Sequence, residues 1–557
     1  MIGVQRKHRI GRFDFWSVVT ILGFVLVILL LIIPLFGIFK SSFIDKETGR
    51  FALSNYREFA SNSYYTGAIL NSLLVSFGGT IGALLFGIPL AYLTSRFRIR
   101  GKAVVATLAV LSLLSPPFIG AYSWILMLGR NGFLRNMLLS VGITLPTIYG
   151  SAGIILVYTL QYYPFVFLLT SGALCTVDRS LEEAAENLGA RGAARFFKVT
   201  LPLVLPSVSA GALIAFMMSL ANFGTPMIIG RNFRVLPTMA YNLFTSEVGE
   251  NPGLASTVSI LLIMVSTIVL FFQRYTVSRR KYASTLINKP IVKRLKGLKS
   301  AAAHLVSYFI VAISTLPLAV VVVYSFRKTS GPVFQPGFGL QSYQKVFHDV
   351  PRTITNSALY SVAAVILIVT VGTLIGYILS RKRNFASKLL DPLLMIPYIV
   401  PGTVLGIGFI VAFNRKPIYL VGTAAIIILS YFIRRLPYSV RSSASILKQI
   451  DPALEEAGIN LGSPPGRTFR KITLPLMMPG IISGAIMSWV TAVNELSASI
   501  VLYVGRTMTM PVRIYLSVLD GLFGTASALA TFLLVATGLA LFIVNKFIGL
   551  GKETLVV

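Results

Sequence analysis

Two matching segments decide how this chain is built. Residues 178–190 read DRSLEEAAENLGA, and residues 451–463 read DPALEEAGINLGS. The match runs without a gap from 178–212 onto 451–485, at a constant offset of 273 positions. Chance does not produce such agreement over 35 positions, so we interpret the two segments as copies of an internal repeat.

A second match lies upstream, at an offset of 285. Residues 71–72 and 95–96 read Asn-Ser and Ser-Arg, and both pairs recur at 356–357 and 380–381. All copies run in the same direction, which predicts two parallel repeats rather than inverted ones. We expect a first repeat over 1–285 and a second over 286–557, joined by a basic linker.

The composition indicates a membrane protein. Of the 557 residues, 55% are hydrophobic and only 12% are charged, with a mean hydropathy of +0.79. This excludes a soluble enzyme, a disordered chain, a fibrous protein and a disulfide scaffold, and the single cysteine, Cys175, cannot form an internal disulfide. We predict an all-α polytopic protein in a lipid bilayer, with about twelve membrane-spanning helices as two parallel six-helix repeats. The apolar runs are 15–39, 59–95, 103–129, 136–177, 199–230, 251–273, 300–326, 353–380, 392–414, 417–433, 472–505 and 521–545. The first part of 136–177 is expected to be a loop or a re-entrant piece.

The charges orient the chain. Lys and Arg number 50 against 18 Asp and Glu. They occur in short runs between apolar stretches, which argues against nucleic-acid binding and for the positive-inside rule. With twelve spans, 34 of the basic residues fall on the side that holds both termini. That side is therefore predicted to be cytoplasmic, and 15–39 is read as an uncleaved first span.

The repeated segments are polar but lie between spans, on the predicted cytoplasmic side. Asp178 or Asp451 can cap a short helix that ends near Gly189 or Gly462. A single copy is explained equally well as an ordinary amphipathic loop at the membrane surface. Two nearly identical copies at equivalent positions favour two docking sites for two copies of a partner.

The pattern resembles the cytoplasmic loop of the permeases of binding-protein-dependent ABC importers, of the MetI-like superfamily. That loop reads Glu-Ala-Ala, three residues, Gly, nine residues, Ile, one residue, Leu-Pro. Here it stands within the loops 178–202 and 451–475, with Val199 in place of Ile and Gly458 in place of the second Ala; we expect Gly458 to loosen its helix. The residues that the resemblance assigns to ATPase coupling are Glu183, Ala184, Ala185, Gly189, Glu456, Ala457, Gly458 and Gly462.

The resemblance covers essentially the whole chain, and the two-copy fusion is most similar to ferric-iron importer permeases. It implies a multi-pass protein of the bacterial plasma (inner) membrane that works by alternating access. Its partners would be two copies of an ATP-binding subunit and an external substrate-binding protein. Similar permeases serve phosphonates, sugar phosphates, thiamine or polyamines, which remain alternatives to ferric iron.

Catalysis is not expected of this chain. It contains no G-x-x-x-x-G-K-[ST] phosphate loop, so ATP and Mg²⁺ would bind the partner subunits and this chain would need no cofactor. No His, Cys, Asp or Glu cluster has the spacing of a metal site.

Polar residues inside a span are the candidates for the transport pathway. Glu495 is an acidic residue within an apolar run, which is costly unless it faces a cavity or a partner. The offset of 273 places it opposite Asn222, and Asn494 precedes it. Either a pathway position or an interhelical hydrogen bond explains these residues. A proton-coupled secondary transporter is a distant alternative, because it would need no repeated docking loop.

Overall fold

The protein is almost entirely helical in the part that the structure describes. The computed structural model describes residues 15–46, 48–190, 192–246, 251–278, 292–382 and 384–548. The first half consists of α1 (Phe15–Val27), the π-helix η1 (Ile28–Ile32), α2 (Ile33–Ser42), α3 (Ser54–Ser61), α4 (Ser63–Arg96), α5 (Lys102–Leu114), α6 (Pro117–Leu128), α7 (Phe133–Ser140), α8 (Ser151–Cys175), α9 (Arg179–Asn187), α10 (Ala193–Arg195), the π-helix η2 (Phe196–Thr200), α11 (Leu201–Leu220), α12 (Gly224–Ile229), α13 (Leu236–Thr245) and α14 (Pro252–Ser278).

The second half repeats this order of helices and adds two small hairpins, β1–β2 and β3–β4, both antiparallel. It consists of α15 (Gly297–Ser325), β1 (Arg327–Ser330), β2 (Val333–Phe338), α16 (Gln341–Asp349), α17 (Pro351–Arg381), α18 (Phe385–Leu393), α19 (Ile396–Ile399), α20 (Gly402–Phe413), β3 (Asn414–Arg415), β4 (Ile418–Tyr419), α21 (Ala424–Leu447), α22 (Ala453–Asn460), α23 (Pro465–Thr468), the π-helix η3 (Phe469–Thr473), α24 (Leu474–Val493), α25 (Ser499–Leu502), the 3₁₀ helix η4 (Gly505–Thr507), α26 (Met510–Leu519) and α27 (Phe523–Ile548). The predicted boundary between 285 and 286 lies outside the described residues.

The chain is a multi-pass membrane protein. Within the described residues, nine helices are long and apolar enough to cross a membrane, and two bent helix pairs raise the number to eleven. The twelfth predicted span corresponds to α21. This helix has 24 residues but carries Arg434, Arg435 and Arg441, so it is less apolar than the others.

Three predicted spans have the wrong limits. The run 417–433 is not one helix, because residues 414–419 form the β3–β4 hairpin and α21 starts at Ala424 and continues to Leu447. Arg434, Arg435 and Arg441 therefore lie within a helix rather than in a loop after it. The run 472–505 is broken after Val493, where α24 ends, and the run 199–230 is broken in the same way after Leu220, where α11 ends. In contrast, the loop predicted in the first part of 136–177 is confirmed for residues 141–150, between the end of α7 at Ser140 and the start of α8 at Ser151.

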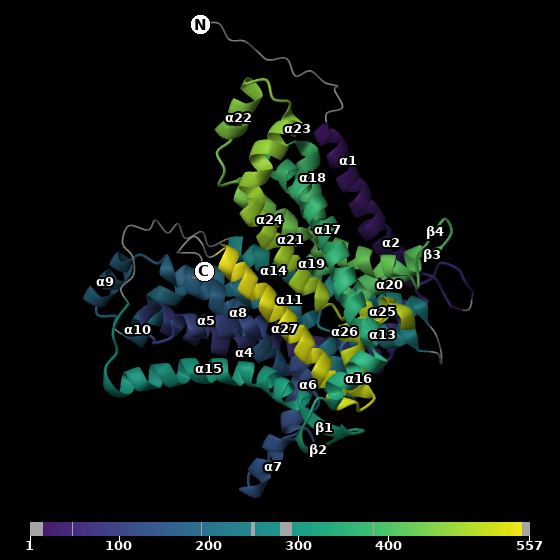
Figure 1. Cartoon of the computed structure of the whole chain (residues 1–557). Coiled ribbons are helices and arrows are strands. Elements are labelled where there is room, and N and C mark those ends of the chain that lie inside the picture. Colours follow the sequence, from purple (N-terminus) through teal and green to yellow (C-terminus); the bar gives the residue numbers. More distant parts are fainter. Residues whose placement is uncertain are drawn as a thin grey trace.

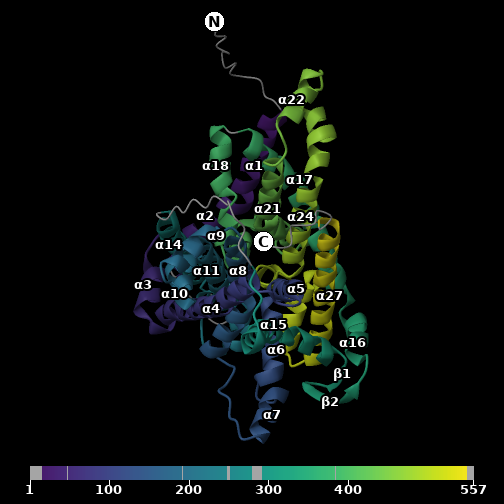
Figure 2. The same cartoon turned by 90° about the vertical axis from the view of Figure 1, so that its left-hand side faces the viewer.

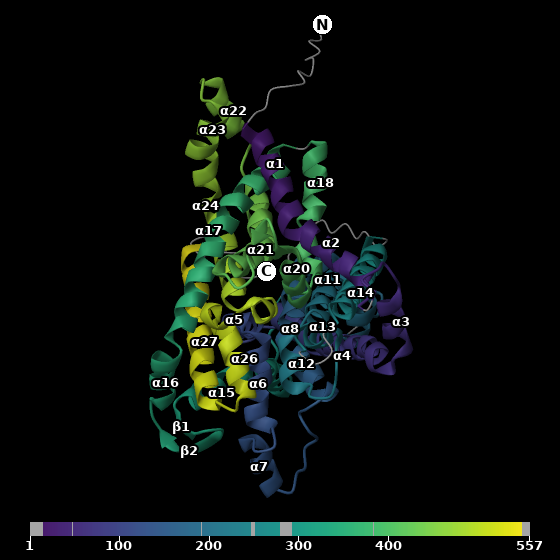
Figure 3. The same cartoon turned by 90° about the vertical axis from the view of Figure 1, so that its right-hand side faces the viewer.

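The first long helix of each half packs against the other half. The continuous helix α1–η1–α2 contacts α17, α18 and α20 of the second half, and α15 contacts α4, α5 and α6 of the first. Figure 3 shows α1 running beside α18 and the helices of the second half. This exchange joins the halves through the bilayer rather than through the linker alone.

Each half has a three-helix centre that depends on close contact between backbones. α4 packs on α8 and α11, and α17 packs equivalently on α21 and α24. A Cβ atom at Gly79 would lie 2.6 Å from Cβ of Tyr158, and one at Gly372 would lie 2.7 Å from Cβ of Ser439. Small residues are therefore needed for these helices to approach each other.

The third span of each half is sharply bent at proline. The bend is 99° between α5 and α6, where Pro116 and Pro117 stand, and 109° before α20, where Pro401 stands. Proline removes a helical hydrogen bond and restricts the residue before it, so the helix stops there. The third span of each half is therefore a broken helix, and each break coincides with proline.

Candidate functional site

The repeated segments fold as two short exposed helices, α9 and α22, at separate extremities of the molecule (Figures 1 and 2). Oδ1 of Asp178 accepts a hydrogen bond from the Ser180 amide at 2.8 Å, and Oδ1 of Asp451 accepts one from the Ala453 amide at 2.9 Å. These contacts satisfy amides that a helix start leaves unpaired. Asp178 is thus the N-cap of α9, as predicted, whereas α22 begins one residue later, after Pro452, and Asp451 bonds to its first amide.

Glycine is required at the end of both helices by backbone geometry. Gly189 and Gly462 each have a φ of +86°, and no atom lies within 4 Å of a Cβ built on either residue. The following amides close the turn: Ala190 donates to the Ala185 carbonyl at 2.9 Å, as in the usual glycine-terminated helix end. Glycine is therefore needed at these positions for its left-handed backbone conformation and not for lack of space around a side chain.

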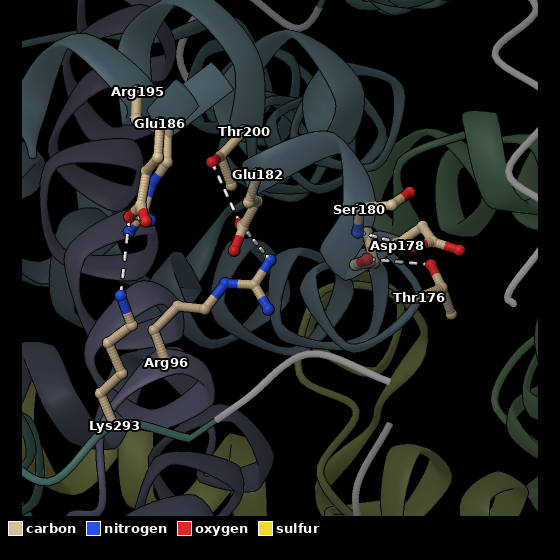
Figure 4. A network of polar contacts seen from close by, with 10 residues as sticks. Arg96, Thr176, Asp178, Ser180, Glu182, Glu186, Arg195, Thr200 and Lys293 are labelled. Carbon is tan, nitrogen blue, oxygen red and sulfur yellow. Dashed lines mark hydrogen bonds and ion pairs between the residues drawn. The ribbon is translucent and has the colours of Figure 1, made fainter. Parts of the chain in front are cut away.

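An ion-pair network fixes α9 to the membrane helices (Figure 4). Glu182 accepts a hydrogen bond from Nη2 of Arg96, at the end of α4, at 2.7 Å, and one from the Thr200 hydroxyl at 3.3 Å. Glu186 pairs with Arg195 and lies 3.6 Å from Nζ of Lys293. Because both ends of α9 are tied to membrane helices, the helix is expected to move with them as one body.

The second copy repeats the central contact. Glu455 accepts a hydrogen bond from Nε of Arg381, at the end of α17, at 3.1 Å, and one from the Tyr377 hydroxyl at 2.9 Å. Arg381 also donates to the Ile450 carbonyl at 2.7 Å. The side chains of Arg381 and Glu455 are 16% and 10% exposed. Each half therefore forms the same Arg–Glu contact, which joins a residue of the match at offset 285 to a residue of the match at offset 273.

The outward face of each helix is apolar at equivalent positions. Leu188 and Leu461 are 89% and 90% exposed, and Leu181 and Leu454 are 46% and 48% exposed. Sequence reasoning did not single out these leucines, although Leu188 and Leu461 lie inside the matched Asn-Leu-Gly. Two equivalent exposed leucine pairs are typical of a docking surface.

The eight residues predicted for coupling divide between the two faces. Six of them are exposed: Glu183, Ala184, Gly189, Glu456, Ala457 and Gly462. Ala185 and Gly458 are buried instead, at equivalent positions. A Cβ atom at Gly458 would lie 2.8 Å from Cδ1 of Ile472, so glycine lets α22 pack closely against η3. Packing, rather than the loosening that we expected, accounts for the departure from alanine.

The pathway candidate Glu495 lies in a break between α24 and α25, not inside a continuous helix. Its side chain is only 4% exposed and pairs with Arg434, at 2.5 Å, and with Arg435, both from α21. Oε1 also accepts a hydrogen bond from the Ala498 amide at 3.2 Å. The buried carboxylate thus has the charged partners that its position in a membrane protein demands. Asn494 is half-buried at the end of α24.

The first half has a neutral version of the same break. Asn222 donates to the Tyr162 hydroxyl at 2.7 Å and accepts a hydrogen bond from the Thr225 amide at 3.0 Å. These residues lie 273 positions before Glu495, Arg435 and Ala498. Gln161, the counterpart of Arg434, donates to the carbonyls of Ser112, at 2.9 Å, and of Ser115, at 2.8 Å, where α5 ends. The correspondence between Asn222 and Glu495 that the offset predicted is confirmed.

The two breaks lie where the halves meet. A Cβ atom at Gly224 would lie 2.8 Å from Cβ of Phe118 and 3.2 Å from Cδ2 of Leu496, which follows Glu495. α12 also contacts α26, and α13 contacts α20. Among the described residues, no group of three or more His, Cys, Asp or Glu is placed to hold a metal ion.

Comparison with known proteins identifies the repeat. The family described as "Binding-protein-dependent transport system inner membrane component" matches twice, at residues 83–282 and 368–550. Each match contains one of the two exposed helices, α9 or α22, and one of the two breaks.

Several relatives align with the chain. The ferric transport system permease protein of Actinobacillus pleuropneumoniae is 30% identical over 95% of this chain and 78% of its own length. A protein of Haemophilus influenzae, also named for a ferric transport system permease, is 31% identical over 91% of this chain and 81% of its own length. The molybdenum transport system permease protein of Escherichia coli K12 is 34% identical, but it covers 36% of this chain and 90% of its own length.

Proposed function

This chain belongs to the family of inner membrane components of binding-protein-dependent transport systems, and we propose that its cargo is ferric iron. It is the permease of an ABC importer. One observation supports this choice of substrate: two relatives that align over more than nine-tenths of this chain, at about 30% identity, are named for ferric transport. The relative named for molybdenum matches only about one half, which supports a shared permease unit more than a shared cargo.

We propose that α9 and α22 are coupling helices that dock on two copies of an ATP-binding subunit. The exposed leucines, Leu188 and Leu461, would enter apolar grooves on that subunit, and Glu183 and Glu456 would pair with basic residues beside them. Hydrolysis would occur on these partner subunits, with their ATP and Mg²⁺. The face of the molecule that carries α9 and α22 would be cytoplasmic, and both termini would lie on that side.

The proposed transport cycle follows from the contacts of the coupling helices. α9 is tied to α4 through Arg96, and α22 is tied to α17 through Arg381, so a displacement of either helix is transmitted to the centre of its half. In this structure α9 and α22 are far apart (Figure 1). Closure of the ATP-binding subunits would bring them together and open the opposite side toward a loaded external binding protein, as a rigid-body rotation of the two halves.

Reconstitution tests this function. The chain is placed in liposomes with its ATP-binding subunit and its binding protein, and uptake of radiolabelled iron is measured with ATP, without ATP and with an imposed proton gradient. We expect uptake that requires ATP and the binding protein, and a complex of one chain with two ATP-binding subunits by native mass measurement. Uptake driven by the proton gradient alone would instead establish a secondary transporter, and uptake of another solute in place of iron would refute the substrate.

A further inference from the structure

The break in the second half holds more positive than negative charge. The guanidinium groups of Arg434 and Arg435 both face the single carboxylate of Glu495. The two arginine side chains are 13% and 16% exposed, so most of this charge is removed from water. Nε of each arginine is buried and has no hydrogen-bond partner among the described residues. One positive charge and two N–H donors are therefore left over.

The fold does not need this charge. In the first half, Gln161, Tyr162 and Asn222 take the equivalent positions and hold an equivalent break with neutral hydrogen bonds. Buried charge that is dispensable for structure is expensive, and in membrane proteins it usually marks a functional position.

The nearby acid of α18 does not compensate for the surplus. Asp391 pairs with Arg441, one further arginine of α21, at 2.9 Å. The three arginines of α21 thus share two carboxylates, Glu495 and Asp391. The remaining charge stays with Arg434 and Arg435.

The surplus charge lies at the junction of the halves. Leu496, directly after Glu495, approaches Gly224 of the first half. Arg434 also lies against the start of α20, because a Cβ atom at Gly402 would come within 2.5 Å of its Nη1. The two arginines therefore stand where the bent third span, the broken fifth span and the partner half come together.

We propose that Arg434 and Arg435 form a binding site for an oxyanion on the route between the two halves. Guanidinium groups bind phosphate and carboxylate oxygens through paired N–H donors, and both side chains retain free donors. An oxyanion in contact with them neutralises the surplus charge, whereas a bare trivalent cation is repelled by it. The site therefore favours cargo that is an oxyanion or is complexed by one. This inference rests on the proposed transport between the halves.

The test uses the whole transporter in liposomes and a variant copied from the first half. R434Q/R435Y/E495N installs the neutral set that already holds the first break, so folding is expected to survive, as thermal unfolding in detergent will report. The binding protein is loaded with radiolabelled iron either in phosphate or in a buffer free of phosphate and carboxylates. Uptake of iron and of radiolabelled phosphate is then measured side by side.

In the unmodified chain we expect phosphate to enter with iron, and iron uptake to fall without an oxyanion. In the triple variant both rates should fall about ten-fold or more, the equivalent of one lost charge-assisted hydrogen bond. R435K keeps the charge but loses the planar guanidinium group with its paired N–H donors. It should fold, and its uptake rates should lie between those of the unmodified chain and the triple variant. It keeps the test decisive if the triple variant does not fold. Iron uptake that is independent of oxyanions, with R435K or the triple variant equal to the unmodified chain, would overturn the site but leave iron as cargo. Phosphate uptake without any iron uptake would support the site and refute the proposed substrate.

Discussion

Truncation of the two exposed leucines should separate docking from folding. The side chains of Leu188 and Leu461 are about nine-tenths exposed, so nearly all of their apolar surface is available to a partner. Leu→Ala removes three carbon atoms, and at roughly 0.8 kcal/mol per buried CH₂ each change should weaken docking by about 2 kcal/mol. That is about thirty-fold in affinity per helix. Because α9 and α22 are far apart and each docks its own subunit, L188A/L461A should lower the affinity for each subunit about thirty-fold, and the product of the two affinities about a thousand-fold.

Affinity for the ATP-binding subunit is measured with the chain in lipid nanodiscs, together with the ATPase rate of the complex. Thermal unfolding of the free chain should be unchanged, because neither leucine packs inside it. L298A is the matched control, since Leu298 at the start of α15 is 87% exposed but lies outside both repeats of the docking segment. Affinity and ATPase rate equal to those of L298A would refute the docking role of these leucines.

Two further predictions use matched neighbours in the second copy. Gly462→Ala should destabilise the end of α22 by roughly 1–2 kcal/mol, because alanine resists the left-handed backbone conformation. Gly466→Ala is the control, because Gly466 has neither a positive φ nor a crowded Cβ position, and it should leave α22 unchanged. Hydrogen exchange of the α22 amides measures the difference between the two variants. Glu455→Gln should lower the stability of the chain by about 3 kcal/mol, because it leaves Arg381 without its buried partner, whereas Glu456→Gln, on the exposed face, should change only ATPase coupling. Equal melting temperatures for the two glutamine variants would contradict the tether.

The sequence predicts the repeated architecture because hydropathy and repetition are both linear signals. The broken third spans follow from Pro116 and Pro401, and the ends of the docking helices follow from Asp178 and Gly189. All of these depend on local backbone chemistry. The repeated Asn-Ser at 71–72 and 356–357 instead reflects long-range contacts: Ser72 and Ser357 accept hydrogen bonds from the amides of Leu236 and Met510, at 2.8 and 2.6 Å.

What the sequence misses depends on partners that are distant in the chain. Arg434 and Arg435 look like the flank of a span, because a window average cannot show that both face a carboxylate about 60 residues later. The C-terminal limit of 417–433 is wrong for that reason. The sequence also does not reveal that α1 and α15 each pack against the opposite half. This packing changes which apolar surfaces contact each other, but it does not change how apolar these surfaces are. Exposure of Leu188 becomes evident only when the rest of α9 is packed.

Fusion of the two repeats explains how a charged break can exist beside a neutral one. In a permease made of two identical chains, each residue near the pseudo-twofold axis occurs twice. Arg434, Arg435 and Glu495 would then occur in both halves, on the two sides of the junction at Gly224, and that junction would hold two surplus positive charges in a medium of low dielectric constant. Such repulsion is strong when water is excluded. With both halves in one chain, one break can keep Asn222 and Tyr162 and the other can carry the arginines. The asymmetry therefore allows a single cationic position at a symmetric junction, where two would repel each other.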